Sequence, residues 1–233
     1  MADIQQFYRD EMRQLGYGEI TLSLENEKGL ETIGLMNSAV WHEDPKRLVF
    51  TLSRYKFVAK MLSGKESVAE IGCGDGFGAR IVKQEVGKLT ITDYDSYFIK
   101  RFEDIASEEW PISAIEHNIL EKPLEQKFDA VYSLDVMEHI HSENEHIFIK
   151  NIIDSVRNSG VIIIGMPSLE SQKYASSGSK DGHVNCKSGK NLKSIMEKYF
   201  DNVFLFSMND EVVHTGFEKM AHYLIVVCTS KKL

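Results

Sequence analysis

Short apolar runs alternate with amphipathic stretches from residue 67 to the end of the chain. Runs rich in Val, Ile and Phe are typical of buried strands, and apolar residues three or four positions apart are typical of helices. The expected strands cover residues 67–72, 88–93, 112–118, 128–134, 160–167, 202–208 and 222–229. The expected helices between them cover 78–86, 96–109, 142–158 and 188–199. This alternation predicts an α/β fold with a doubly wound, seven-stranded, mostly parallel sheet.

The last two expected strands break the alternation, because no helical pattern separates them. We therefore expect a C-terminal antiparallel hairpin. A loop rich in Ser, Gly and Lys is expected over 168–187, directly after the apolar run of the fifth strand. Such a loop follows the carboxyl end of a strand, where ligands of doubly wound sheets bind.

The first 62 residues do not show the alternation of strands and helices that the rest of the chain shows. Residues 1–16 have the apolar spacing of a short helix, and residues 17–44 are predicted to be irregular. Pro45 can open a helix, and helical spacing then continues to residue 62. We expect two parts, an N-terminal helical extension that caps the substrate over 1–45 and an α/β domain over 46–233.

Composition narrows the classes of function. The 35 acidic and 27 basic residues give a net charge of −8, and no Lys/Arg-rich run is present, which argues against a nucleic-acid partner. No apolar run is long enough to span a membrane, and the charged N-terminus is unlike a secretory signal. Three scattered cysteines suit neither a disulfide framework nor a zinc site. A reduced, cytoplasmic setting is expected, with no membrane partner.

A glycine-rich segment, AEIGCGDGFG, follows the first strand at residues 69–78. Its glycines permit positive φ angles and a close approach of a ligand to the backbone. The second strand ends in Asp93, whose carboxylate can accept both hydroxyls of a ribose. Nicotinamide, flavin and S-adenosylmethionine sites all use this pairing. The dinucleotide fingerprint is met only loosely, as Gly74-x-Gly76-x-x-Ala79.

The segment FDAVYSLDVMEHIH, at residues 128–141, adds a second motif. Together with the glycine segment and Asp93, it resembles the class I S-adenosylmethionine-dependent methyltransferases of small-molecule type. The resemblance covers roughly residues 46–165. It implies a Rossmann-like fold, S-adenosyl-L-methionine as the methyl donor and S-adenosyl-L-homocysteine as the product.

The resemblance also assigns a cofactor site. Its residues are Arg54, Glu70, Gly72, Gly74, Gly76, Asp93, Asn118, Ile119 and Asp135. The three glycines would pass under the methionine part, while Glu70 would order the loop and reach toward the amino group. Asp93 would bind the ribose, and Asn118 and the N–H of Ile119 would meet the adenine. Asp135 would line the methionine end, and Arg54 would meet the cofactor carboxylate.

Transfer of a methyl group to a hydroxyl needs a base, and histidine is the usual base near neutral pH. His139 follows the fourth strand and His183 lies in the loop after the fifth, so both are candidate catalytic residues. A metal site is not predicted: Glu138, His139 and His141 could supply ligands, but their spacing at a helix start would not point them together.

The acceptor is expected to be a small polar molecule that enters between the N-terminal extension and the loop 168–187. Four lysines in or beside this loop favour an anionic acceptor: Lys173, Lys180, Lys187 and Lys190. O-methylation of a sugar, nucleotide-sugar or phosphorylated metabolite is the first hypothesis. Small-molecule N-methylation, a non-catalytic S-adenosylmethionine-binding protein and a nicotinamide-dependent reductase are the alternatives. Nucleic-acid base methylation is disfavoured, because the turn SLDVME lacks the proline motif of the adenine enzymes.

Overall fold

A computed structural model of the chain describes residues 10–11, 14, 16, 27 and 29–232. The chain divides into two units, Met1–Ile33 and Gly34–Leu233, and all strands of the described residues belong to the second. The helix predicted over 1–16 falls largely outside the described residues. Among the helices that are described, none has the length and apolar character needed to cross a membrane.

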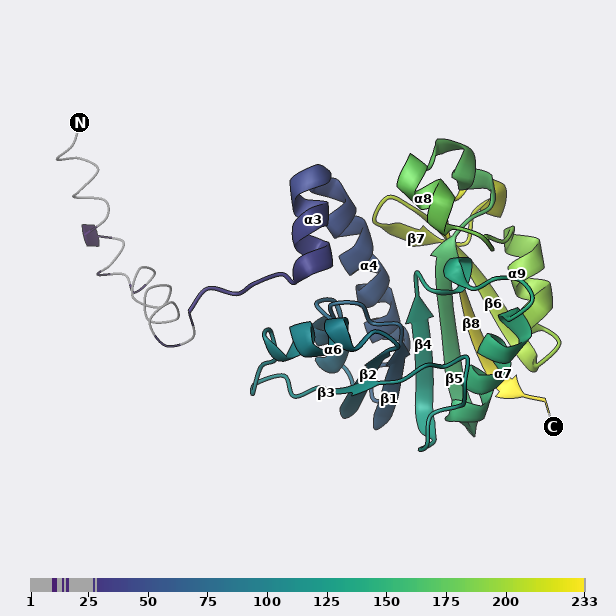
Figure 1. Cartoon of the computed structure of the whole chain (residues 1–233), viewed down its shortest axis with the longest axis horizontal. Helices are drawn as coiled ribbons and strands as arrows, with labels where there is room; N and C mark the ends of the chain where they lie inside the picture. The colour runs from purple at the N-terminus through teal and green to yellow at the C-terminus, as the bar shows by residue number, and fades with distance from the viewer. Residues whose placement is uncertain (1–9, 12–13, 15, 17–26, 28, 233) are drawn as a thin grey trace. The chain divides into compact units, whose positions relative to one another are not determined.

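A single mixed sheet forms the centre of the second unit, with the strand order β3-β2-β1-β4-β5-β8-β6-β7 (Figure 1). Its strands are β1 (Ser67–Ile71), β2 (Lys88–Asp93), β3 (Ser113–Glu116), β4 (Phe128–Leu134), β5 (Val156–Pro167), β6 (Phe200–Asn209), β7 (Val212–His214) and β8 (Tyr223–Lys231). All pairs among β1 to β5 are parallel. Strand order reverses between β1 and β4, so the carboxyl ends of these two strands flank the point where doubly wound sheets bind ligands.

The C-terminal strands complete the sheet in the antiparallel sense. β8 lies between β5 and β6 and is antiparallel to both. The expected hairpin is thereby confirmed. The sheet has eight strands where seven were predicted, and the additional strand is the three-residue β7, which pairs with the end of β6. A strand this short has too few residues for a period-2 pattern to be recognised in the sequence.

The helices of the second unit include α3 (Leu35–Glu43), α4 (Lys46–Met61), α5 (Ala79–Lys83), α6 (Ser96–Glu103), α7 (Glu145–Ser155), α8 (Ser177–Gly182) and α9 (Gly189–Met196). Three short 3-10 helices accompany them: η1 (Met137–His139), η2 (Glu170–Tyr174) and η3 (Glu218–Met220). The prediction of irregular structure over 17–44 was wrong for α3. This helix buries no residue, so its sequence lacks the apolar stripe on which such a prediction depends.

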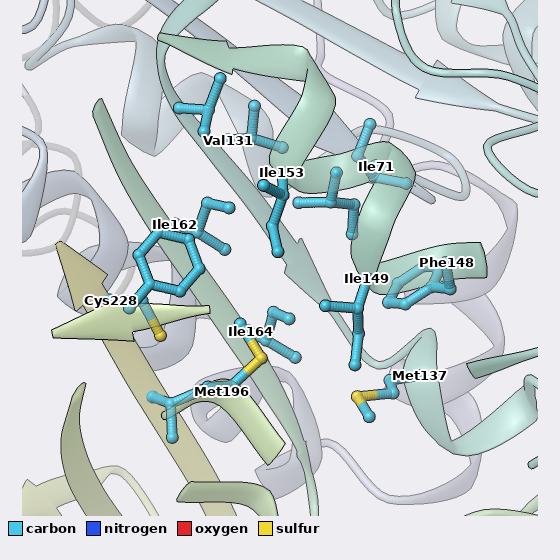
Figure 2. Close-up of a cluster of buried hydrophobic side chains, with 14 of the residues drawn as sticks. Ile71, Val131, Met137, Phe148, Ile149, Ile153, Ile162, Ile164, Met196 and Cys228 are labelled. Atoms are coloured by element: carbon cyan, nitrogen blue, oxygen red, sulfur yellow. The ribbon is translucent and has the colours of Figure 1, made fainter. Parts of the chain in front are cut away.

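Two apolar layers cover the two faces of the sheet. In one layer α7 and α9 pack on side chains such as Ile71, Val131, Ile162 and Ile164 (Figure 2). In the other layer α4, α5 and α6 pack on the opposite face, where Ile163 points. Neighbouring residues of β5 thus belong to different layers, as the period of a strand requires. Because helices cover both faces of the sheet, the ends of the strands are the place where a ligand site can form.

Candidate active site at the carboxyl ends of the strands

The glycine segment is fastened to the end of β2. The N–H groups of Gly72 and Cys73 donate to the carbonyl oxygen of Thr92, at 2.8 and 2.9 Å. Gly72, Gly74 and Gly76 have φ angles of 75°, 53° and 68°. Side chains rarely tolerate such angles, so glycine is needed at each of these positions. The result is a backbone cradle at the switch point of the sheet.

Asp93 connects this cradle to the second strand. One carboxylate oxygen accepts a hydrogen bond from the Gly74 N–H at 2.9 Å, and the other accepts one from the Asp95 N–H at 3.0 Å. The side chain is almost fully buried. Burial raises the pKa of Asp93, while the backbone hydrogen bonds lower it. An oriented carboxylate beside a glycine cradle suits an S-adenosyl ligand, because it can accept hydroxyl hydrogen bonds from a ribose.

Glu70 lies beneath the cradle, with no exposed surface. The Tyr55 hydroxyl donates to one carboxylate oxygen at 2.7 Å, and the Tyr132 hydroxyl donates to the other at 2.8 Å. Burial raises the pKa of Glu70 to about 7, although these two hydrogen bonds oppose the rise. The arrangement agrees with a loop-ordering acid. Contact with a cofactor amino group, which the sequence also suggested, would have to use a second lone pair on an oxygen that already accepts from a tyrosine.

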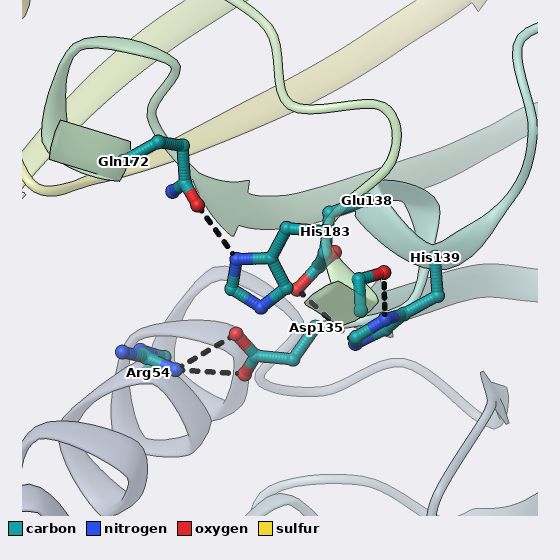
Figure 3. A network of polar contacts seen from close by, with 7 residues as sticks. Arg54, Asp135, Glu138, His139, Gln172 and His183 are labelled. Atoms are coloured by element: carbon teal, nitrogen blue, oxygen red, sulfur yellow. Dashed lines mark hydrogen bonds and ion pairs between the residues drawn. The ribbon is translucent and has the colours of Figure 1, made fainter. Parts of the chain in front are cut away.

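Asp135 follows β4 and faces α4. Both of its carboxylate oxygens accept from Nη1 of Arg54, at 2.9 and 2.7 Å (Figure 3). The Arg54 guanidinium in turn lies 3.8 Å above the ring of Tyr223 in β8. Asp135 has a φ of 57°, unusual for a residue with a side chain. Such strain is common at functional sites and directs this carboxylate toward α4.

His139 and His183, the two predicted bases, lie together (Figure 3). Their ring centroids are 5.2 Å apart. Nδ1 of His139 is 2.9 Å from the carbonyl oxygen of Gly182, and Nδ1 of His183 is 2.8 Å from Oε1 of Gln172. Because a carbonyl oxygen only accepts, Nδ1 of each ring donates, so the neutral form of each ring is the tautomer with its lone pair on Nε2. Burial, followed by the proximity of His139, lowers the pKa of His183.

Glu138 joins the two histidines, although sequence reasoning did not expect it to converge on them. Its Oε1 lies 4.0 Å from Nε2 of His139. The sequence analysis considered Glu138 and His139 together with His141, whereas the third member of this cluster is His183; Glu138 and His139 belong to the 3-10 helix η1. Only the path of the loop after β5 brings His183 back to this place. Gln172, which holds His183, was missed for the same reason.

The residues assigned to the adenine lie beyond β3. Oδ1 of Asn118 accepts from the Leu120 N–H at 3.0 Å, and its Nδ2 donates to Glu121. Ile119 is buried, and its carbonyl oxygen accepts from Asn151 at 2.7 Å. This turn is ordered by its own hydrogen bonds. The assignment of Asn118 and Ile119 to the adenine stays a prediction.

Helix α3 is tied to the glycine segment by Asp75. One oxygen of this buried carboxylate accepts from the N–H groups of Met36 and Asn37, at 2.9 and 3.1 Å. Its other oxygen accepts from the Asn37 side chain at 2.9 Å. Asp75 therefore caps the start of α3 from a distant part of the sequence, because the residue at the N-cap position, Gly34, has no side chain.

A large hollow lies at the other end of the strands. Its volume is about 580 Å³, and its lining includes the first residues of β1, β2, β3 and β4. None of the predicted site residues lines it. We assign the site to the carboxyl ends on chemical grounds, because the positive-φ glycines, Asp93 and the two histidines all lie there.

Comparison with known proteins supports this assignment. Residues 69–164 match the family described as "Methyltransferase domain". A tRNA U34 carboxymethyltransferase of Shewanella woodyi is 29% identical over 102 residues, which are 42% of this chain and 30% of that protein. A probable S-adenosylmethionine-dependent methyltransferase of Mycolicibacterium smegmatis is 27% identical over 115 residues, 48% of this chain and 42% of that protein. The chain therefore spans less than half the length of these curated relatives.

The fold has solved counterparts. The N-methyltransferase NodS from Bradyrhizobium japonicum, in complex with S-adenosyl-L-homocysteine, superposes with a TM-score of 0.63. The match covers 90% of this chain and 97% of that chain at 15% sequence identity, which establishes likeness of fold. Residues 69–164 thus match a methyltransferase domain, and the chain resembles S-adenosylmethionine-dependent methyltransferases in sequence and in fold. S-adenosyl-L-methionine is the methyl donor of this enzyme class.

Proposed function

We propose that this chain transfers a methyl group from S-adenosyl-L-methionine to a hydroxyl oxygen of a small polar molecule. The observation that carries the proposal is the pair of imidazoles, His139 and His183, beside Asp135 at the end of β4. In the neutral form of each ring the lone pair is on Nε2, as hydroxyl activation requires. An amine acceptor has its own lone pair and needs no such pair of bases.

The donor site of this proposal is formed by the cradle and its neighbours. Gly72, Gly74 and Gly76 would accommodate the methionine part, and Asp93 would bind the ribose. Arg54 would meet the cofactor carboxylate, because its Nε is buried without a partner in the described part of the chain. S-adenosyl-L-methionine supplies an activated methyl on a sulfonium. The protein aligns the acceptor with it and excludes water.

Deprotonation of the acceptor is assigned to Nε2 of His139 or His183. Burial keeps His183 neutral near pH 7, because it lowers the pKa of the imidazole. The Gln172 amide is itself fixed: its Nε2 donates to the Ser168 carbonyl oxygen at 3.1 Å, so its Oε1 faces His183. The His183 ring is therefore held in one tautomer and one orientation.

The acceptor class follows from charge. Lys173 and Lys180 are exposed in the loop after β5, whereas Lys187 is neutralised by Glu145 at 2.7 Å. We infer an acceptor with modest negative charge, such as a nucleotide-sugar or a phosphorylated metabolite, with an uncharged sugar as the remaining candidate. The name of the Shewanella relative refers to tRNA. The net charge of −8 favours a small molecule over a polynucleotide for this chain.

The test is a screen of sugar, nucleotide-sugar and phosphorylated metabolite pools, with unmodified tRNA as a separate arm, read by formation of S-adenosyl-L-homocysteine. Of His139→Ala and His183→Ala, the variant that removes the base should lower kcat by about 100-fold or more, as expected for loss of a general base. His146→Ala, at an exposed histidine of α7, is the matched control and should keep wild-type turnover. Full activity of both single variants would refute their assigned role, and turnover with tRNA alone would refute the small-molecule acceptor.

A further inference from the structure

Three side chains of the kinds that bind metals converge beside β4. Glu138, His139 and His183 each offer one ligand atom, and these atoms lie within 4.8 Å of one another. Two of them come from η1 and the third from the end of α8, so the fold rather than the local sequence brings them together. Two imidazoles and a carboxylate form a ligand set for divalent transition metals.

Glu138 supplies an independent observation. Its side chain is 1% exposed, and its Oε2 has no hydrogen-bond partner among the described residues. A buried carboxylate oxygen without a partner is costly, and proteins usually satisfy such a group. The other oxygen faces Nε2 of His139 at 4.0 Å. The carboxylate of Glu138 thus faces the two histidines, and its Oε2 has no hydrogen-bond partner among the described residues.

The histidines are arranged as metal ligands usually are. Ligating imidazoles commonly donate their second ring N–H to a carbonyl or a carboxylate, which fixes the tautomer and orients the ring. Here Nδ1 of His139 donates to the Gly182 carbonyl, and Nδ1 of His183 donates to Gln172. Both Nε2 lone pairs are left for a shared partner. A pair of mutually hydrogen-bonded imidazoles would instead need one of these nitrogens protonated.

We propose that Glu138, His139 and His183 bind one divalent transition-metal ion, which in turn binds the acceptor hydroxyl. The inference rests on the proposed function and refines one step of it: the ion activates the hydroxyl in place of a free imidazole, because the Nε2 atoms of both histidines bind the ion. Ligand atoms of one ion at about 2.1 Å lie at most about 4.2 Å apart. The cluster therefore needs only small side-chain rotations to close on an ion.

The ion has a defined chemical role. It lowers the pKa of the bound hydroxyl, whose proton leaves to solvent water. An oxygen lone pair then forms the O–CH3 bond while the methyl–sulfur bond breaks, and that electron pair stays on sulfur. The products are the methyl ether, S-adenosyl-L-homocysteine and one proton. His139 is about half exposed, so the side of the ion next to it is open to an acceptor.

The proposal is tested on the full chain after removal of metals with a chelator and dialysis. Zn²⁺, Mn²⁺ and Co²⁺ salts are titrated by calorimetry, and the visible d–d absorption of Co²⁺ reports the ligand environment. We expect one equivalent to bind. Glu138→Gln, His139→Ala and His183→Ala should weaken binding by more than about 100-fold, because loss of outer partners alone costs about 10–100-fold. Gln172→Ala should weaken metal binding by about 10–100-fold, because Gln172 orients the His183 ring without binding the ion itself.

The controls separate this inference from the proposed function. His146→Ala should bind the ion like the wild type, and S-adenosyl-L-methionine affinity in every variant checks folding. Equal metal affinity in the wild type and in a His139→Ala/His183→Ala double variant would overturn the site. Full methyl transfer in the presence of chelator would also overturn it and leave the proposed function standing. An ion on these ligands without transfer to any hydroxyl would refute the proposed function alone.

Discussion

At the scale of single residues, Asp93 illustrates how a position that is obvious in the sequence acquires its function from the fold. Its place at the end of an apolar run identifies it as a ligand-facing acid. The structure adds two backbone donors, Gly74 N–H and Asp95 N–H, which hold one carboxylate orientation. The residue thus orders the cradle, and we propose that it also presents an oxygen to the ribose of the methyl donor.

Asp93→Asn should weaken binding of S-adenosyl-L-methionine by about 10–100-fold, because hydrogen bonds to a charged group contribute about 1.5–3 kcal/mol. The amide would also turn an NH2 group toward a backbone N–H. Calorimetry measures the dissociation constant. Asp95→Asn is the matched control, because Asp95 caps α6 through the Tyr97 N–H and asparagine caps helices as well. Unchanged affinity in Asp93→Asn would remove Asp93 from the cofactor site.

At the scale of secondary-structure elements, α3 depends on a cap that lies outside itself. Asp75→Ala removes the acceptor of two backbone N–H groups at its start. Loss of a cap costs about 1–2 kcal/mol, so the amides of Met36 and Asn37 should exchange with solvent about 5–30-fold faster. Hydrogen exchange followed by NMR measures this. The amide of Tyr97, which Asp95 caps, should not change, and equal acceleration there would indicate general unfolding instead.

The same scale shows what the sequence could predict. Strands β1, β2 and β4 were recognised nearly to the residue, because each is a short run dominated by aliphatic, aromatic and β-branched residues that is buried on both faces. Helix α3 was missed, because it has no apolar stripe and its cap, Asp75, lies 39 positions from Met36. Local patterns carry no information about such distant partners.

The candidate site likewise contains residues that the sequence could predict and contacts that depend on the tertiary structure. The glycines and Asp93 could be proposed as site residues from spacing alone, because the cradle is one continuous strand–loop unit and Asp93 ends the neighbouring strand. The contact between Glu138 and His183, and the Tyr223 platform under Arg54, depend on how loops return across the sheet. Sequence reasoning named His139 and His183 separately and had no means of pairing them.

At the scale of the whole molecule, Glu70 makes stability depend on pH. Its pKa is about 7 in the folded chain and 4.5 in the reference state, so folding favours the protonated form. The stabilisation is therefore complete below about pH 4.5 and is lost as the pH rises through about 7. A difference of roughly 2.5 units corresponds to about 3 kcal/mol.

Glu70→Gln should remove this dependence. The amide is isosteric with the carboxyl group and carries no charge. Between about pH 5 and pH 9, the free energy of unfolding of the variant should therefore fall by roughly 3 kcal/mol less than that of the wild type. Urea denaturation across that range measures the difference. Glu66→Gln, at an exposed position just before β1, should leave the wild-type slope unchanged. A wild-type slope in Glu70→Gln would show that the buried acid does not carry the effect.

The position of β8 between β5 and β6 has a consequence for biosynthesis. The ribosome makes β5 first, then α9, β6 and β7, and only afterwards the strand that fills the gap. Until β8 emerges, β5 has one unpaired edge and Arg54 lacks the Tyr223 ring beneath it. A nascent chain stalled before residue 223 would expose that edge to other chains and hold an unfinished site. Protection of β5 by chaperones should therefore be needed until translation has passed β8.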